Sequence, residues 1–182
     1  MQYLNEAELS KLFRVMHAGN KMHHLAALTA FWTGARVSQV LRLQGQDIFE
    51  SKGKVVIKIH AAKRGNEHLH TLHIDADPAF DMSPLIALAK TRPTARLFAG
   101  LTRQYQNIKL KAACVEAGIH TDFGHMHTLR HSISIQIWNA THSLGAISEF
   151  LQHRSPQSAL IYLKENDSLL AQQAVDMIQL VA

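Results

Sequence analysis

Apolar side chains recur at helical spacing along most of this chain, and they alternate at period two in only one stretch. Near the start, Leu9, Leu12 and Met16 fall on one helical face, behind Asn5 and Glu8 in the spacing of a capping box. A period of 3.6 residues indicates a helix, whereas a period of two indicates a strand. The chain is therefore predicted to be mostly helical.

The alternating stretch predicts one hairpin. Val55, Ile57 and Ile59 alternate with Lys54, Val56, Lys58 and His60, which predicts a strand. Residues 69–74 are expected to form its return strand across the polar turn at 62–67. The predicted fold class is thus mostly α with a small antiparallel β-sheet (α+β). Helices are expected to start at Asn5 and at Ser83-Pro84, and to span residues 21–33, 37–43, 102–117, 127–140, 144–152, 156–163 and 167–181.

Length and composition exclude several classes of protein. The 182 residues suffice for about one domain, and 47% hydrophobic with 18% charged residues is typical of a globular chain. Cys114 is the only cysteine, which excludes an intrachain disulfide and a cysteine-built zinc site. No signal peptide or membrane-spanning run is evident, so a cytoplasmic protein without a membrane partner is expected. The formal charge of +5 favours a polyanionic partner, nucleic acid first.

Four short segments carry polar side chains suited to an anion. Each has an ordinary structural explanation when taken alone: an arginine at a helix end, a solvated turn, a polar helix face, or a core aromatic. In the third segment, His127, Arg130 and His131 are spaced i, i+3 and i+4 and share one helical face, a good anion site. The segments are Thr33–Ser38 with Arg36, Ala62–Glu67 with Lys63, His127–His131, and Leu151–Pro156 followed by Tyr162.

The order and spacing of these segments resemble the catalytic domain of the tyrosine recombinase (phage integrase) family. The family's first box, hairpin lysine, second box, third box and nucleophile fall here on Thr33–Gln39, Lys63, His127–His131, Leu151–His153 and Tyr162. The resemblance implies that residues 1–182 form a single catalytic domain, and we expect the family's N-terminal core-binding domain to be absent. Three positions depart from the family pattern: Gln39 replaces an acidic residue, Met126 a proline and Gln152 a glycine.

The resemblance implies a role for each matching residue. Arg36 and Arg130 would clamp the phosphate oxygens bidentately, and His153 would add a third donor. Tyr162 would attack as the phenolate, with His127 as its base.

The remaining roles concern the leaving group and support of the site. Lys63 would protonate the leaving 5′ oxygen. Gln39 and His131 would support the site, with Gln39 orienting Arg36.

The implied reaction is site-specific DNA recombination or integration, as in mobile elements, through a 3′-phosphotyrosyl intermediate. It requires neither metal nor ATP, because the covalent link conserves the bond energy. The implied partners are double-stranded DNA, other protomers in a synaptic tetramer through the C-terminal helix, and accessory DNA-bending proteins; the place of action is the nucleoid. Basic residues expected to track phosphates are Lys54, Lys58, Arg64, Arg103, Lys109, Lys111 and Arg154.

Three alternatives remain open. The His-x-His pairs at 68–70 and 125–127 are candidate zinc ligands, although no acidic or cysteine ligand clusters with them. The second alternative is a DNA-binding regulatory module that has lost catalysis. The third is a type IB topoisomerase, which relaxes DNA with a similar set of residues.

Overall fold

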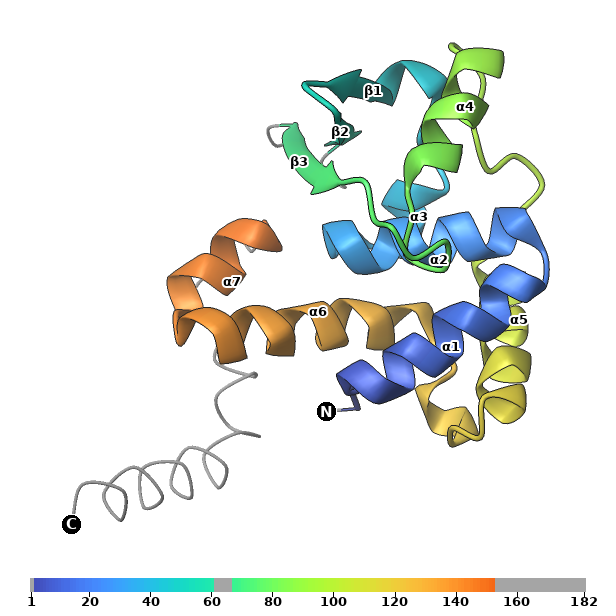
Figure 1. Cartoon of the computed structure of the whole chain (residues 1–182), viewed down its shortest axis with the longest axis vertical. Helices are drawn as coiled ribbons and strands as arrows, with labels where there is room; N and C mark the ends of the chain where they lie inside the picture. Colours follow the sequence, from blue (N-terminus) through green and yellow to red (C-terminus); the bar gives the residue numbers. More distant parts are fainter. Residues whose placement is uncertain (1, 61–66, 153–182) are drawn as a thin grey trace. The chain divides into compact units, whose positions relative to one another are not determined.

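The computed structural model describes residues 2–60 and 67–152 (Figure 1). Residues 2–133 form one compact unit, and the chain from residue 134 onward forms a second, of which residues 134–152 are described. The described residues include no helix that is both long and apolar enough to cross a membrane.

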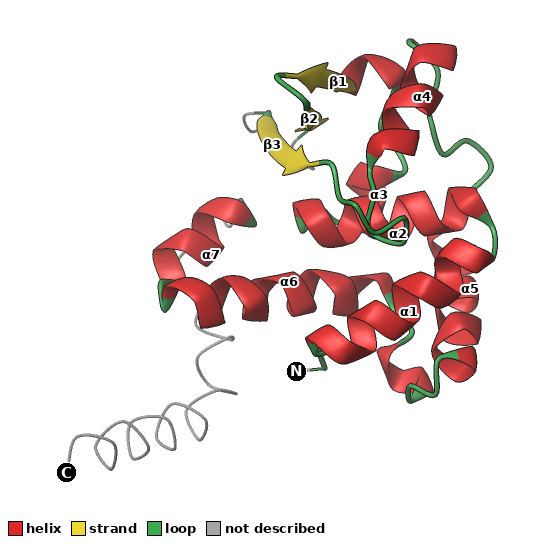
Figure 2. Ribbon diagram, in the orientation of Figure 1, coloured by secondary structure: helices red, strands yellow, loops and turns green. Residues whose placement is uncertain are grey.

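The described residues are mostly helical with one small sheet, as predicted (Figure 2). The elements in chain order are α1 (Glu6–Ala18), α2 (Lys21–Thr33), α3 (Val37–Val40), η1 (Gly45–Asp47), β1 (Ile48–Ser51), β2 (Lys54–Ile59), β3 (His68–His73), α4 (Ser83–Thr91), α5 (Arg103–Glu116), η2 (Thr121–Phe123), α6 (Met126–Thr141) and α7 (Leu144–Phe150), where η marks a 3-10 turn.

Local side-chain hydrogen bonds set the helix starts. The capping box of α1 is confirmed: Asn5 Oδ1 accepts from Glu8 N, and Glu8 Oε2 accepts from Asn5 N, both at 2.9 Å. Thr102 caps α5 by accepting from Tyr105 N at 3.1 Å. At the other end of α2, Gly34 adopts the left-handed conformation with φ 59°, which glycine reaches without steric cost.

Several helix boundaries differ from the prediction: α5 is shorter by one residue at each end and α6 is longer by one residue at each end. The third helix ends at Val40 rather than residue 43, because Arg42 N and Leu43 N donate to carbonyls three residues back, those of Gln39 and Val40, each at 3.1 Å, and no longer four residues back. The fourth helix begins at Ser83, as predicted, and the Ser83 N–H donates to Asp81 Oδ1 at 2.8 Å. The seventh ends at Phe150 rather than 152. The helices predicted at 156–163 and 167–181 lie outside the described residues.

The sheet contains a strand that alternation did not reveal. Its order is β1-β2-β3, antiparallel throughout, with Ile48 opposite Ile57 and Ile57 opposite His70. β2 and β3 form the predicted hairpin. β1 escapes prediction because only Ile48 is buried and the three residues after it are exposed; it forms by pairing with β2, not by its own pattern.

The core of the first unit surrounds α2, whose side chains from His23 to Phe31 are buried. Phe13 packs against Phe31 and Phe80, with each pair of ring centroids 5.4 Å apart. A helix buried on all sides is held rigidly by its neighbours. The turn at Gly34, where α2 ends, is consequently fixed in place.

In the second unit, Ser143 caps α7 by accepting from Ala146 N at 3.1 Å. The Trp138 and His142 rings meet edge to face with centroids 5.8 Å apart. These contacts give the described part of this unit its local order.

Candidate functional site

The turn after α2 presents Arg36. After Gly34 the chain is extended, and Arg36 occupies the N-cap position of α3 with φ −66° and ψ 144°. The side chain of Gln39 reaches back, and its Oε1 accepts from Arg36 N at 3.0 Å. The backbone of Arg36 is thus held from both sides, by the rigid end of α2 and by the first turn of α3.

Arg130 is joined to the same turn. It lies in the first turns of α6 and is only 4% exposed, and its guanidinium donates to the carbonyl of Gly34. A buried guanidinium needs such acceptors, because an unpaired charge in a core costs several kcal/mol. The backbone two residues before Arg36, the other predicted clamp residue, therefore anchors Arg130.

His127 lies in the same cluster of positive charge. Its pKa is lowered from 6.5, first by partial loss of water contact, then by the charges of Arg130, Arg36 and Arg103. The imidazole is consequently neutral at pH 7 and able to accept a proton. Arg103, at the start of α5, is thus near enough for its charge to contribute to this shift.

His131 supports the cluster from one turn further along α6. Its ring meets the His127 ring edge to face, with centroids 4.4 Å apart. Burial, followed by the charges of His127 and Arg130, lowers its pKa to about 4. His131 is therefore neutral over the physiological range, in keeping with the predicted supporting role.

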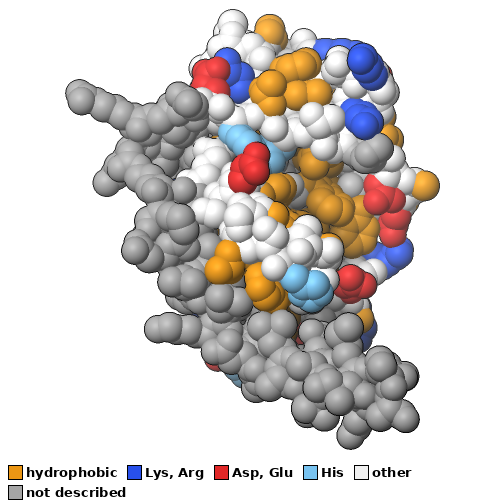
Figure 3. Space-filling model, turned by 90° about the vertical axis from the view of Figure 1, so that its left-hand side faces the viewer, with side chains coloured by type: hydrophobic (Ala, Val, Ile, Leu, Met, Phe, Trp, Pro, Cys, Tyr) orange, Lys and Arg blue, Asp and Glu red, His pale blue; other side chains and the backbone are white. Residues whose placement is uncertain are grey.

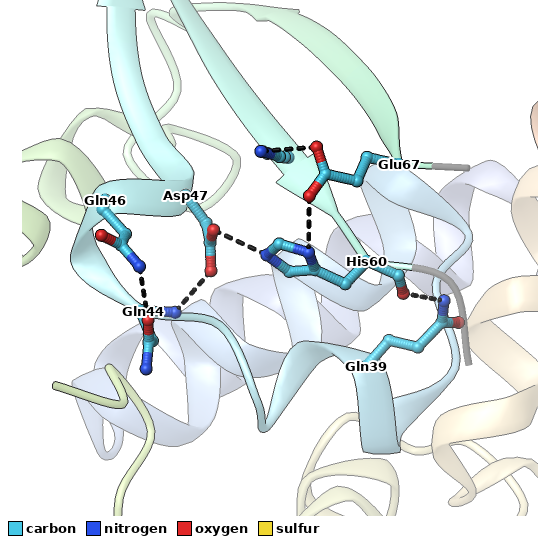
Figure 4. Close-up of polar contacts among 7 residues, drawn as sticks. Gln39, Gln44, Gln46, Asp47, His60 and Glu67 are labelled. Carbon is cyan, nitrogen blue, oxygen red and sulfur yellow. Dashed lines mark hydrogen bonds and ion pairs between the residues drawn. The ribbon is translucent and has the colours of Figure 1, made fainter. Parts of the chain in front are cut away.

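A network of polar side chains joins the turn at Arg36 to the end of the sheet (Figure 4). Gln39 Nε2 donates to the His60 carbonyl at 2.8 Å. The His60 ring has Asp47 Oδ1 2.7 Å from Nε2 and Glu67 Oε1 3.2 Å from Nδ1. Glu67 also pairs with Lys58 at 2.5 Å, and this hydrogen bond is the main reason its pKa is lowered. The network links the first arginine's turn to all three strands.

The other predicted residues fall into two groups. Lys63, Arg64, His153, Arg154 and Tyr162 lie outside the described residues. Lys54, Lys58, Arg103, Lys109 and Lys111 are on β2 and α5.

Two of these basic residues contact other side chains. Lys109 Nζ lies 5.2 Å from the centroid of the Tyr105 ring, a cation–π contact, and Lys58 is paired with Glu67. On the face drawn in Figure 3, lysine and arginine side chains are scattered among acidic and apolar ones.

The structure adds Asp47, His60 and Glu67, which the sequence analysis did not single out. Asp47 precedes a strand that alternation did not reveal, and Glu67 sits in an ordinary polar turn. Only the strand register brings them to His60. No sequence signal short of that register would have identified the network.

The zinc alternative finds no support in the parts of the chain that the structure describes. His68 and His70 lie close, with ring centroids 4.7 Å apart. No group of three or more histidine, cysteine, aspartate or glutamate side chains among those residues is placed to hold a metal ion.

Comparison with known proteins agrees with the sequence resemblance. Residues 2–168 match the Phage integrase family. Tyrosine recombinase XerH of Campylobacter jejuni is 26% identical over 144 residues, which cover 76% of this chain and 40% of that protein. Tyrosine recombinase XerD of Rickettsia conorii is 28% identical over 159 residues, covering 79% and 50%. The chain thus spans about half the length of the curated relatives it matches.

Solved structures share the fold. XerH site-specific recombinase bound to difH substrate, a pre-cleavage complex, superposes with a TM-score of 0.76 at 22% identity, covering 94% of this chain and 54% of that one. The catalytic domain of bacteriophage HP1 integrase superposes with a TM-score of 0.62 at 20% identity, covering 90% and 88%. With the boxes at Arg36 and Arg130 joined in one site and a family match over nearly all of its length, this chain belongs to the phage integrase family.

Proposed function

We propose that this chain carries out site-specific recombination of double-stranded DNA by tyrosine-nucleophile cleavage and strand exchange. The observation that carries the proposal is the hydrogen bond from the Arg130 guanidinium to the Gly34 carbonyl, which joins both arginines at one turn beside a neutral His127. Two guanidiniums and a proton acceptor suit a phosphodiester in transfer, where negative charge develops on the phosphate oxygens.

The proposed reaction gives each matching residue one role. Tyr162 attacks the phosphorus while its phenolic proton passes to His127. The bond from phosphorus to the 5′ oxygen breaks, and Lys63 supplies the proton that this oxygen takes. Arg36, Arg130 and His153 stabilise the charge on the non-bridging oxygens. A 3′-phosphotyrosyl bond results, and an incoming 5′-hydroxyl reverses the step.

The proposed partners and requirements follow from this chemistry. Each cleavage is balanced without hydrolysis, so neither a metal ion nor ATP is needed. Relatives captured with a DNA substrate, as pre-cleavage and post-cleavage complexes, support DNA as the partner. Strand exchange between two duplexes calls for several protomers, so a synaptic tetramer joined through the C-terminal helix, aided by DNA-bending proteins, is part of the proposal.

Covalent trapping tests the proposal. The protein is incubated in EDTA with a pool of nicked duplexes whose cleaved 5′-hydroxyl fragment dissociates, and adducts are resolved on denaturing gels. Peptide mass spectrometry is expected to place the DNA on Tyr162, and Tyr162→Phe is expected to form no adduct while still binding DNA. An adduct on another residue would refute the assignment of the nucleophile.

The same assay separates the alternatives. Binding without any adduct would favour a regulatory module that has lost catalysis. Adducts at many unrelated sequences, with relaxation of supercoiled DNA, would favour a type IB topoisomerase activity. A small set of trapped sequences, sharing one motif, is the outcome that a site-specific recombinase predicts.

A further inference from the structure

The amide of Gln39 makes two hydrogen bonds of opposite sense. Its Oε1 accepts from Arg36 N at 3.0 Å, and its Nε2 donates to the His60 carbonyl at 2.8 Å. A backbone N–H can only donate and a carbonyl can only accept, so the two partners fix which end of the amide faces each. A carboxylate in this position would keep the first bond and lose the second.

His60 is in turn held by its side chain. Asp47, only 3% exposed, accepts from Gln44 N at 2.8 Å through Oδ2 and contacts the His60 ring at 2.7 Å through Oδ1. β2 and β3 pair as far as Ile59 opposite His68, so the next residue of each strand, His60 and Glu67, face each other across the end of the ladder. The two ends of the hairpin connection are thereby joined to each other and to a buried carboxylate.

The two hydrogen-bond partners of the Gln39 amide lead to two different residues of the proposed chemistry. On one side, Gln39 accepts a hydrogen bond from the backbone of Arg36. Lys63 lies in the six residues between His60 and Glu67. The Gln39 side chain is thus a direct link between the backbone that carries an arginine of the clamp and the base of the hairpin that carries the proton donor.

We propose that Gln39 and His60 are positioning residues that tie the base of the Lys63 hairpin to the Arg36 turn, and that this tie requires an amide at position 39. The proposal rests on the proposed function, since Lys63 is taken as the general acid. It gives a physical reason for the glutamine where the family usually has an acid. Glutamine is the residue that can bond both partners, whereas a carboxylate would repel the His60 carbonyl.

The decisive variant is Gln39→Glu, which restores the residue usual in the family. We expect it to slow cleavage by roughly three- to tenfold, the effect of losing one hydrogen bond. Gln46→Glu is the matched control: Gln46 is an exposed glutamine near the same sheet that donates to Gln44 at 2.7 Å and takes no part in the tie. It adds the same charge and is expected to cleave at the rate of the unchanged chain.

A sulfur leaving group separates positioning of the proton donor from a general loss of structure. A thiol ionises with a pKa of about 8.5, so sulfur in place of the 5′ oxygen departs without a proton. On such DNA, made at the trapped site, Gln39→Glu, His60→Ala and Lys63→Ala are all expected to regain the rate of the unchanged chain. Arg130→Ala is expected to stay slow, because its clamp is needed with either leaving group.

Each outcome bears on the proposal. Gln39→Glu cleaving ordinary DNA at the normal rate, or staying slow on the sulfur substrate, would overturn it. If the unchanged chain forms no adduct with any DNA, the proposed function fails and this proposal with it. An active unchanged chain with an unrescued Gln39→Glu variant overturns the tie alone.

Discussion

At the scale of single residues, Arg130 shows how a buried charged side chain is held in place for its proposed role. Its guanidinium donates to the Gly34 carbonyl. That bond restricts the orientation of the group, which lowers the entropic cost of placing it against a phosphate. Lysine offers charge but not this fork.

We predict that Arg130→Ala lowers the rate of covalent adduct formation by about 10²–10³-fold, because a preorganised donor to a developing charge is lost. Arg130→Lys should recover only a small part of that rate. Single-turnover trapping at saturating protein measures both, and thermal unfolding of each variant checks that the fold persists. Near-normal turnover in Arg130→Ala would remove this residue from the clamp.

At the scale of elements, the ends of α1 and the strands of the sheet make separate contributions to stability. We predict that Asn5→Ala lowers the free energy of unfolding by about 1 kcal/mol, since it removes one of the two bonds of the capping box. Urea denaturation measures the loss. Lys11→Ala, an exposed change in the middle of the same helix, should alter stability by a few tenths of a kcal/mol at most.

The strand β3 carries a buried histidine that makes the fold sensitive to acid. Burial, together with the charge of His68, lowers the pKa of His70 to about 4, whereas an unfolded histidine keeps its ordinary 6.5. Between these values the unfolded chain binds the proton more readily, so the free energy of unfolding falls as pH falls. We predict a loss on the order of 2 kcal/mol from His70 between pH 7 and pH 5.

Urea denaturation at several pH values measures that loss. His70→Leu should make the pH dependence over this range less steep whatever it does to stability at pH 7, and the part of the slope that comes from His131, whose pKa is also lowered to about 4, should remain. Replacing the exposed His120 by Gln should leave the slope as it was. An unchanged slope in the His70 variant would show that other groups cause the acid sensitivity.

At the scale of the whole molecule, the excess of positive charge should govern DNA affinity. Each phosphate contact releases counterions and contributes about −0.9 to the slope of log affinity against log salt. We predict that Arg103→Gln makes this slope less steep by about one unit, because Arg103 lies beside the arginine cluster. Lys90→Gln, in the last turn of α4, should leave the slope unchanged. Fluorescence titrations over a range of salt concentrations provide the comparison.

Local patterns determined much of the fold and pointed to part of the site. The capping box at Asn5 and the shared helical face of His127, Arg130 and His131 depend on neighbours within four residues, and both were predicted from sequence. Periodicity likewise predicted the hairpin of β2 and β3. Such features follow from sequence because hydrogen bonds and helical geometry act over a few residues.

Contacts between distant segments were decided only by the tertiary structure. Arg130 meets the Gly34 carbonyl across 96 positions, and Gln39 meets the His60 carbonyl across 21. Asp47 reaches the His60 ring because β1 pairs with β2. The sequence of β1 does not alternate between apolar and polar residues, so this pairing was not predicted. The sequence by itself therefore identified the side chains that are proposed to carry the chemistry, and the helix ends beside them. Packing of buried helices and strand register determined which partners orient those side chains, because such contacts depend on the position of the whole backbone.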